Sequence, residues 1–169
     1  MGNSETHNAG DRAQHNTGDS KSGNVGDGNI TAGSEKSYAG GCLCGALRYS
    51  TQGEPRFSGL CYCADCRKAS GSGFIPFMGF ARSAVRFSGA SLEYRSSARG
   101  GGDAVRNSCL VCGGLVFGGE RLKDDSFTIY AGSLDDPTLF RPRIAIFTRG
   151  RPAWAVIAPE LTVFEDAPP

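Results

Sequence analysis

The chain has 169 residues, a hydrophobic content of 39% and a formal net charge of +1, which fit one globular domain. The near-neutral charge argues against nucleic-acid binding through a basic surface, and no apolar run approaches the roughly 18 residues that span a bilayer. The start shows neither the basic region nor the apolar core of a signal peptide. We therefore expect a cytoplasmic protein without nucleic-acid or membrane partners.

The first part of the chain differs in composition from the rest. Residues 1–37 consist largely of Gly, Asn, Ser, Asp and Thr, contain no aromatic residue and hold both histidines, His7 and His15. Such a segment offers little to bury, so we expect a disordered tail at 1–37 and a single domain at 38–169. Because this domain has no histidine, any proton transfer must use a carboxyl, a thiol, a tyrosine or metal-bound water.

The expected domain has the pattern of a mainly β fold with many turns. The chain contains 25 glycines and 8 prolines, and its apolar segments are short and separated by Gly, Ser and Arg. Pro76 predicts an edge strand or a bulge, and Arg67 to Ser70 predict one helical turn that ends at Gly71. The expected strands include residues 46–50, 74–80, 85–87, 92–94, 115–117 and 127–131, and a last pair at 144–148 and 154–157.

All seven cysteines fall into three groups, and none stands alone. In a reducing compartment, clustered cysteines bind metal more often than they form disulfides. A Cys-X-X-Cys followed by Gly is typical of a zinc knuckle, which supplies two of four ligands. The groups are Cys42 and Cys44; Cys61, Cys63 and Cys66; and the knuckle of Cys109 and Cys112.

The two zinc ligands that the knuckle does not supply could come from the first group or from the middle group. Pairing the two outer groups gives a closed four-cysteine zinc site and leaves Cys61, Cys63 and Cys66 as three ligands with an open fourth position, as in catalytic zinc sites. Three alternatives remain: disulfides, one structural zinc with three ordinary cysteines, and an iron-sulfur cluster.

Several other residues near the middle group are candidates for substrate contact. Arg67 and Lys68 could receive a substrate carboxylate or form a solvated basic turn. Asp65 could tune the metal or cap the following turn. Trp154 and the phenylalanines at 74, 77 and 80 could line a pocket or pack in the core.

Taken together, these motifs resemble a known family. Gly41-Cys42-Leu43-Cys44-Gly45, Cys61-Tyr62-Cys63-Ala64-Asp65-Cys66-Arg67-Lys68, Cys109-Leu110-Val111-Cys112-Gly113 and Ala131-Gly132-Ser133-Leu134-Asp135-Asp136-Pro137 are similar, in this order, to the glutathione-dependent formaldehyde-activating enzyme family, also called the CENP-V/GFA domain. The resemblance covers about Tyr38 to Phe164. Tyr62 stands where many relatives have His, and a late His of many relatives is missing from Ile144 to Phe147.

The resemblance implies an Mss4-like fold of antiparallel sheets that is stabilised by zinc. It also implies two zinc ions per chain: a structural one on Cys42, Cys44, Cys109 and Cys112, and an exchangeable one on Cys61, Cys63 and Cys66. The implied activity joins glutathione and formaldehyde to S-hydroxymethylglutathione, a carbon-sulfur lyase reaction.

Two functions are therefore expected. The first is a zinc-dependent carbon-sulfur lyase that acts on a small thiol such as glutathione, with Arg67 and Lys68 as substrate-binding residues and no assigned catalytic group beyond the exchangeable zinc. The alternative is a non-catalytic zinc module that carries glutathione or binds a protein partner. The sequence leaves the oligomeric state open.

Overall fold

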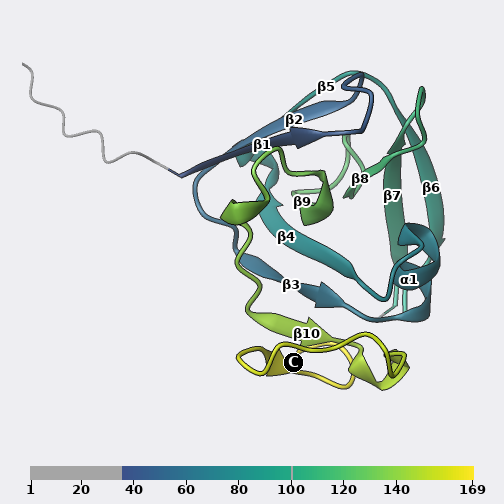
Figure 1. Ribbon diagram of the computed structural model, residues 1–169. Helices are drawn as coiled ribbons and strands as arrows, with labels where there is room; N and C mark the ends of the chain where they lie inside the picture. The colour runs from purple at the N-terminus through teal and green to yellow at the C-terminus, as the bar shows by residue number, and fades with distance from the viewer. Residues whose placement is uncertain (1–35, 100) are drawn as a thin grey trace, which may run out of the picture. The chain divides into compact units, whose positions relative to one another are not determined.

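The computed structural model describes residues 36–99 and 101–169. These residues form eleven strands in two sheets, with one α-helix between β3 and β4 (Figure 1). The mainly β prediction is thus confirmed. The expected tail, residues 1–37, lies outside the described residues except for its last two.

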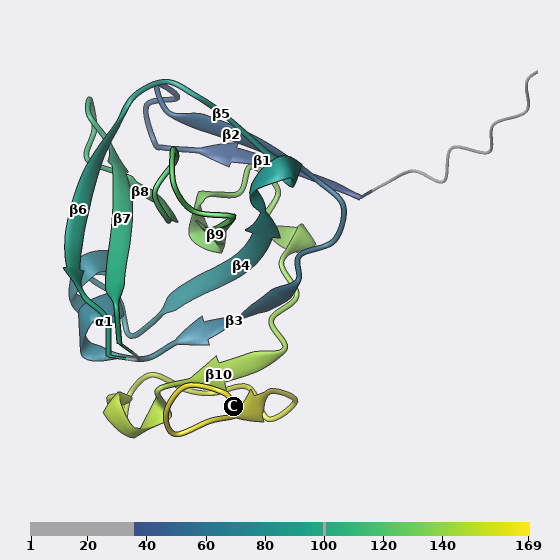
Figure 2. The same cartoon turned by 180° about the vertical axis from the view of Figure 1, so that it is seen from behind.

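The smaller sheet is antiparallel and has the order β1-β2-β5. Both views of the chain show it lying across one end of the larger sheet (Figures 1 and 2). Its strands are β1 (Ser37–Gly41), β2 (Arg48–Gln52) and β5 (Val85–Ser88).

The larger sheet has eight strands in the order β11-β10-β3-β4-β9-β8-β7-β6. It is mixed, because β10 pairs in parallel with both β3 and β11, whereas the other pairs are antiparallel, so the expectation of antiparallel sheets holds except at β10. The long connection between β9 and β10 returns the chain to the end at which β3 begins, which makes this pairing parallel. The strands are β3 (Phe57–Cys61), β4 (Ile75–Ala81), β6 (Ser91–Ser97), β7 (Asp103–Cys109), β8 (Leu115–Gly118), β9 (Ser126–Tyr130), β10 (Ile144–Ile146) and β11 (Thr162–Val163).

The helix α1 (Ala64–Ser70) begins three residues before the predicted turn. Its N-cap is Cys63, whose sulfur accepts a hydrogen bond from the Cys66 N–H, so the capping role considered for Asp65 belongs to Cys63. Gly71 ends the helix with φ +65°, which glycine adopts without strain. Short 3-10 helices occupy Arg82–Ala84, Ala131–Ser133, Pro137–Leu139 and Thr148–Gly150. No helix in the described part of the chain is long and apolar enough to cross a membrane.

Two local predictions are wrong. Pro76 lies in β4, which is paired on both sides, but β4 pairs with β9 only from Phe77 onwards, so the N–H that proline lacks is not needed there. Trp154 lies in a turn and is 71% exposed, so the pair expected at 144–148 and 154–157 does not form; β10 pairs with β3 and with Thr162–Val163 instead.

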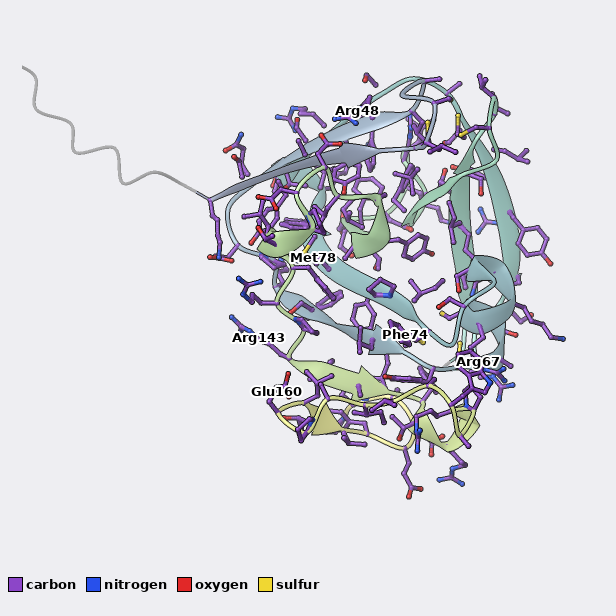
Figure 3. The ribbon with its side chains drawn as sticks, in the orientation of Figure 1. Arg48, Arg67, Phe74, Met78, Arg143 and Glu160 are labelled. Carbon is purple, nitrogen blue, oxygen red and sulfur yellow. The ribbon has the colours of Figure 1, made fainter. Side chains whose placement is uncertain are left out.

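Strand alternation gives the larger sheet two different faces. On one face, Met78 of β4 and Ile129 of β9 enter the main core between the two sheets (Figure 3). On the other face, paired residues such as Phe77 and Tyr130 point away from that core. The end of β3, which carries Cys61, therefore borders a sheet face that this core does not cover, whereas Cys109 at the end of β7 packs in the core itself.

Candidate metal centre and its cavity

The four outer cysteines lie together where two tight turns meet. Cys42 and Cys44 follow β1, Cys109 is the last residue of β7, and Cys112 lies in the turn after it. The sulfur of Cys42 accepts a hydrogen bond from the Leu47 N–H at 3.2 Å, and that of Cys109 accepts one from the Val111 N–H at 3.3 Å. Burial raises the pKa of Cys42, but the Leu47 N–H and the neighbouring thiols lower it to about 6. Backbone N–H groups thus favour the thiolate form that binds metals.

The spacing of these four sulfurs fits a zinc ion. Sulfurs at the corners of a tetrahedron, each about 2.3 Å from the metal, lie about 3.8 Å apart. The Sγ atoms of Cys42 and Cys44 are 3.6 Å apart, and those of Cys44 and Cys109 are 3.7 Å apart. All four Sγ atoms lie within 4.8 Å of one another. This group can therefore close around a metal with little movement.

The three middle cysteines form a second group. Cys61 ends β3, Cys63 caps α1 and Cys66 lies in its first turn, and their Sγ atoms are also within 4.8 Å of one another. Hydrogen bonds from the Cys61 and Cys66 thiols lower the pKa of Cys63, whereas hydrogen bonds to Cys63 and Cys66 and burial raise that of Cys61. Among the described residues no fourth Cys, His, Asp or Glu joins this group. A metal here would keep one position open.

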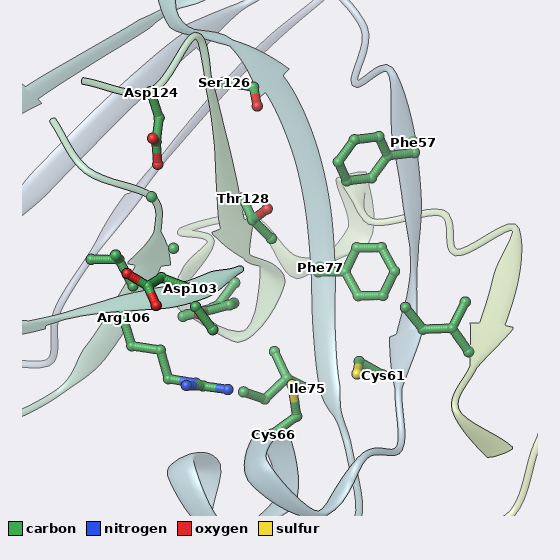
Figure 4. A pocket seen from close by; sticks show the side chains of 16 residues that line it. Phe57, Cys61, Cys66, Ile75, Phe77, Asp103, Arg106, Asp124, Ser126 and Thr128 are labelled. Carbon is green, nitrogen blue, oxygen red and sulfur yellow. The ribbon is translucent and has the colours of Figure 1, made fainter. Parts of the chain in front are cut away.

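A cavity of about 380 Å³ opens beside this second group (Figure 4). Strand register explains its lining: Cys61 pairs with Ile75, Phe77 with Tyr130, and Thr128 with Gly118, so these side chains share one face of the sheet. The Phe57 ring occupies the space above Gly79, where an added Cβ would lie 2.0 Å from the ring. The complete lining is Phe57, Cys61, Cys66, Ile75, Phe77, Asp103, Ala104, Val105, Arg106, Gly118, Gly119, Asp124, Ser126, Thr128, Tyr130 and Ile146.

Arg106 carries the positive charge of this cavity. It projects from β7 toward Cys66 (Figure 4) and is only 8% exposed. One terminal nitrogen donates to Ser96 Oγ at 3.0 Å, whereas the buried Nε has no partner among the described residues. Burial lowers the pKa of Arg106, but Tyr130 and the Cys66 thiol raise it overall, so the guanidinium remains charged. This buried cation lies beside a group of sulfurs that becomes anionic on metal binding.

The remaining polar side chains of the cavity supply acceptors and donors. Asp124 accepts the Glu120 N–H at 2.8 Å, and Asp103 pairs with Arg95 at 3.2 Å. Burial raises the pKa of Tyr130, which therefore stays protonated at neutral pH. The cavity thus offers a cation, two carboxylates and a phenol to a polar ligand.

The expected carboxylate-binding residues, Arg67 and Lys68, lie outside this cavity. Arg67 lines a different hollow of about 310 Å³ together with Cys63, beside the C-terminal loops (Figure 3), and its Nε is buried without a partner among the described residues. Lys68 is exposed and lines a third hollow of about 400 Å³ that also includes Arg106. Two neighbouring helix residues point in different directions, so they flank the three-cysteine group from separate sides.

Arg106, Tyr130 and Asp124 were not among the candidates predicted from the sequence. A signal for Arg106 was present, because a charged residue within the strand-like run Ala-Val-Arg-Asn-Ser is unusual without a buried partner. Phe74 and Phe80, for which a pocket was one expectation, pack in cores, whereas Phe77 does line the cavity. Tyr62 is fully buried, and its hydroxyl donates to the Val156 carbonyl.

Comparison with known proteins supports the resemblance seen in the motifs. The sequence profile of the glutathione-dependent formaldehyde-activating enzyme family matches residues 37–150. The chain belongs to this family. The matched region of this GFA protein contains all seven cysteines and the strands that form the cavity.

A solved structure provides a comparison for this GFA protein. A crystal structure of a Rhodobacter sphaeroides protein is similar to it, with 21% identity and a TM-score of 0.44 over 57% of this chain and 87% of that one. Among curated proteins, none matches the chain. Family membership indicates glutathione-related chemistry.

Proposed function

We propose that this protein is a zinc-dependent carbon-sulfur lyase that forms or breaks the bond between a thiol such as glutathione and a small aldehyde. Formaldehyde, which would give S-hydroxymethylglutathione, is the aldehyde that the family name supports. The observation that carries the proposal is the three-cysteine group with no fourth ligand among the described residues, beside a polar cavity of about 380 Å³.

The two cysteine groups would hold two zinc ions with different roles. Cys42, Cys44, Cys109 and Cys112 would form a closed structural site, because four thiolates supply all the ligands of a tetrahedral zinc. Cys61, Cys63 and Cys66 would hold the exchangeable ion. Zinc bound there would take up the substrate thiol as a thiolate and act as a Lewis acid.

Residues of the cavity would position the thiol substrate. Glutathione carries carboxylates and an ammonium group, and the cavity holds both a buried guanidinium, Arg106, and the carboxylates of Asp103 and Asp124. Arg106 would donate to a substrate carboxylate through nitrogens that are not bonded to Ser96. Arg67 and Lys68 would serve carboxylates that reach the neighbouring hollows.

Tyr130 would supply the proton in a domain without histidine. When the sulfur attacks the aldehyde carbon, the C–S bond forms, the carbonyl π bond breaks and the aldehyde oxygen requires a proton. The Tyr130 hydroxyl lines the cavity and holds its proton at neutral pH because burial raises its pKa. Water would return the proton to the phenol after the step.

A second function, a non-catalytic zinc module that carries glutathione or binds a protein partner, is favoured by a different observation. The turns that carry the outer cysteines expose Leu43, Leu110 and Val111, which are 97%, 59% and 75% accessible. Exposed apolar side chains at neighbouring turns suit partner contact. For either function we propose the cytoplasm as the location, since its reducing conditions keep the thiols free.

The test of the proposed function measures zinc per chain and turnover on the same samples. Wild-type protein should contain two zinc ions, Cys63→Ser one, and dialysis against excess glutathione should lower the wild-type value toward one. Cys109→Ser serves as the matched control, because it should lose the other ion and destabilise the fold.

Turnover separates the two candidate functions. The wild type should accelerate formation of the glutathione-formaldehyde adduct above the uncatalysed rate, and Cys63→Ser should not. Glutathione binding without any acceleration would support the non-catalytic carrier function. A single zinc in both the wild type and Cys63→Ser would show that Cys61, Cys63 and Cys66 hold no zinc.

A further inference from the structure

A further cavity, of about 500 Å³, gathers three arginines. Arg82 follows β4, Arg86 lies in β5, and Arg121 lies in the loop between β8 and β9. Ser83 and Phe87 also line it, and no acidic residue does. None of its lining residues belongs to the cavity beside the three cysteines, so it is a separate site.

These three arginines are held in place without being neutralised. Each uses one terminal nitrogen to donate to a backbone carbonyl: Arg82 to Asp124 at 3.4 Å, Arg86 to Ser83 at 2.9 Å, and Arg121 to Gly89 at 3.0 Å. A carbonyl is uncharged. Within the described part of the chain, none of the three guanidinium groups has a carboxylate within 4.0 Å.

Arg121 holds its guanidinium against two aromatic rings, where water reaches it little. Its guanidinium carbon lies 4.8 Å from the centre of the Phe87 ring and 5.2 Å from that of Phe117. Its Nε and one terminal nitrogen are buried without a partner among the described residues. Burial lowers the pKa of Arg121 by more than the charge of Glu93 raises it, which reflects the cost of a desolvated charge. A bound anion would offset this cost.

We propose that this cavity binds a phosphate-type oxyanion, either inorganic phosphate or the phosphate group of a monoester. The free guanidinium nitrogens of Arg82 and Arg86 would donate to the oxygens in the forked geometry that suits phosphate. The Ser83 hydroxyl lies at the same wall and adds a donor. Arg121 contributes charge from its position against the rings, and the volume leaves space for an organic group attached to the phosphate.

The test titrates the zinc-loaded protein with inorganic phosphate by calorimetry at constant ionic strength, with chloride as the competing ion. We expect saturable binding that Arg82→Gln/Arg86→Gln weakens at least tenfold. Arg141→Gln is the matched control, because Arg141 also donates to backbone carbonyls but lines none of the cavities described above. It should change the dissociation constant less than twofold.

Two further variants keep the result interpretable if the double variant folds poorly. Arg86 and Ser83 are exposed, so Arg86→Gln and Ser83→Asp should fold, and Ser83→Asp should abolish binding by placing a carboxylate in the cavity. Zinc content should stay the same in every variant. Glycerol phosphate distinguishes the sources: tighter binding than phosphate indicates a monoester, and equal binding indicates free phosphate. Absence of saturation, or undiminished binding in Ser83→Asp, would overturn the proposal.

Discussion

Replacing Arg106 by glutamine should weaken the binding of carboxylate-bearing thiols far more than that of neutral thiols. Arg106 is the cation of the cavity beside the three cysteines and is only 8% exposed, so water screens its charge little. Glutamine keeps a polar amide in the cavity, but its side chain is two atoms shorter, so the substitution removes the charge, the fork and the hydrogen bond to Ser96.

The size of the effect follows from the kind of hydrogen bond that the substitution removes. A hydrogen bond to a charged group contributes about 1.5–3 kcal/mol, and each 1.4 kcal/mol corresponds to about tenfold in affinity. Arg106→Gln should therefore raise the dissociation constant for glutathione about 10- to 150-fold. The constant for 2-mercaptoethanol, which has no carboxylate, should change by less than about threefold.

The assay uses cobalt in place of zinc, because sulfur coordination gives the cobalt ion a measurable absorption band that a thiol ligand alters. Both thiols are titrated into wild-type protein, Arg106→Gln and the control Arg141→Gln. Equal reductions in affinity for the two thiols in Arg106→Gln would mean that Arg106 only balances the charge of the sulfur group. Unchanged glutathione affinity would refute the role assigned to it.

Three further changes test the fold. Ile129→Ala, at a fully buried position, should cost about 2–5 kcal/mol of unfolding free energy in urea, whereas Leu122→Ala, at a 91% exposed position, should cost under about 0.5. Gly40→Ala should destabilise by about 1–3 kcal/mol because its Cβ would lie 2.2 Å from the Ser133 carbonyl oxygen; Gly132→Ala, with open space around it, is the control, and equal destabilisation would contradict this reasoning. Burial raises the pKa of Tyr49 to about 12 from its ordinary value of 10.0, so the tyrosine loses its proton at lower pH in the unfolded state than in the folded state. The protonated Tyr49 therefore contributes at most about 2.7 kcal/mol to the free energy of unfolding below pH 10, and this contribution should disappear between pH 10 and 12. Tyr49→Phe should flatten that decline in urea midpoints, and an unchanged slope would count against the assignment.

The cysteine groups were predictable because each is a local motif. Thiols separated by only one or two residues lie close together in each group, and a glycine follows both Cys44 and Cys112 and permits a tight turn. The structure brings the outer four and the middle three together in the groups that counting favoured. The short strands and frequent glycines likewise indicated a mainly β fold.

The cavity was not predictable because it depends on strand register. Arg106 faces Cys66 only because β7 pairs with β8, β8 with β9, and so on across the sheet to β3. No local pattern specifies that order. The parallel pairing of β10 with β3 and the exposed position of Trp154 were missed for the same reason, since both depend on where a long connection returns the chain.

The sulfur of Cys63 has two roles, which different substitutions of this residue would separate. It belongs to the three-cysteine group and also caps α1, a helix of seven residues that is too short to persist without tertiary support. Serine is a good N-cap and a poor soft-metal ligand, whereas alanine is neither. Amide hydrogen exchange at Cys66 should therefore stay slow in Cys63→Ser and become fast in Cys63→Ala, so that loss of metal alone leaves the helix formed and ready to receive the ion again.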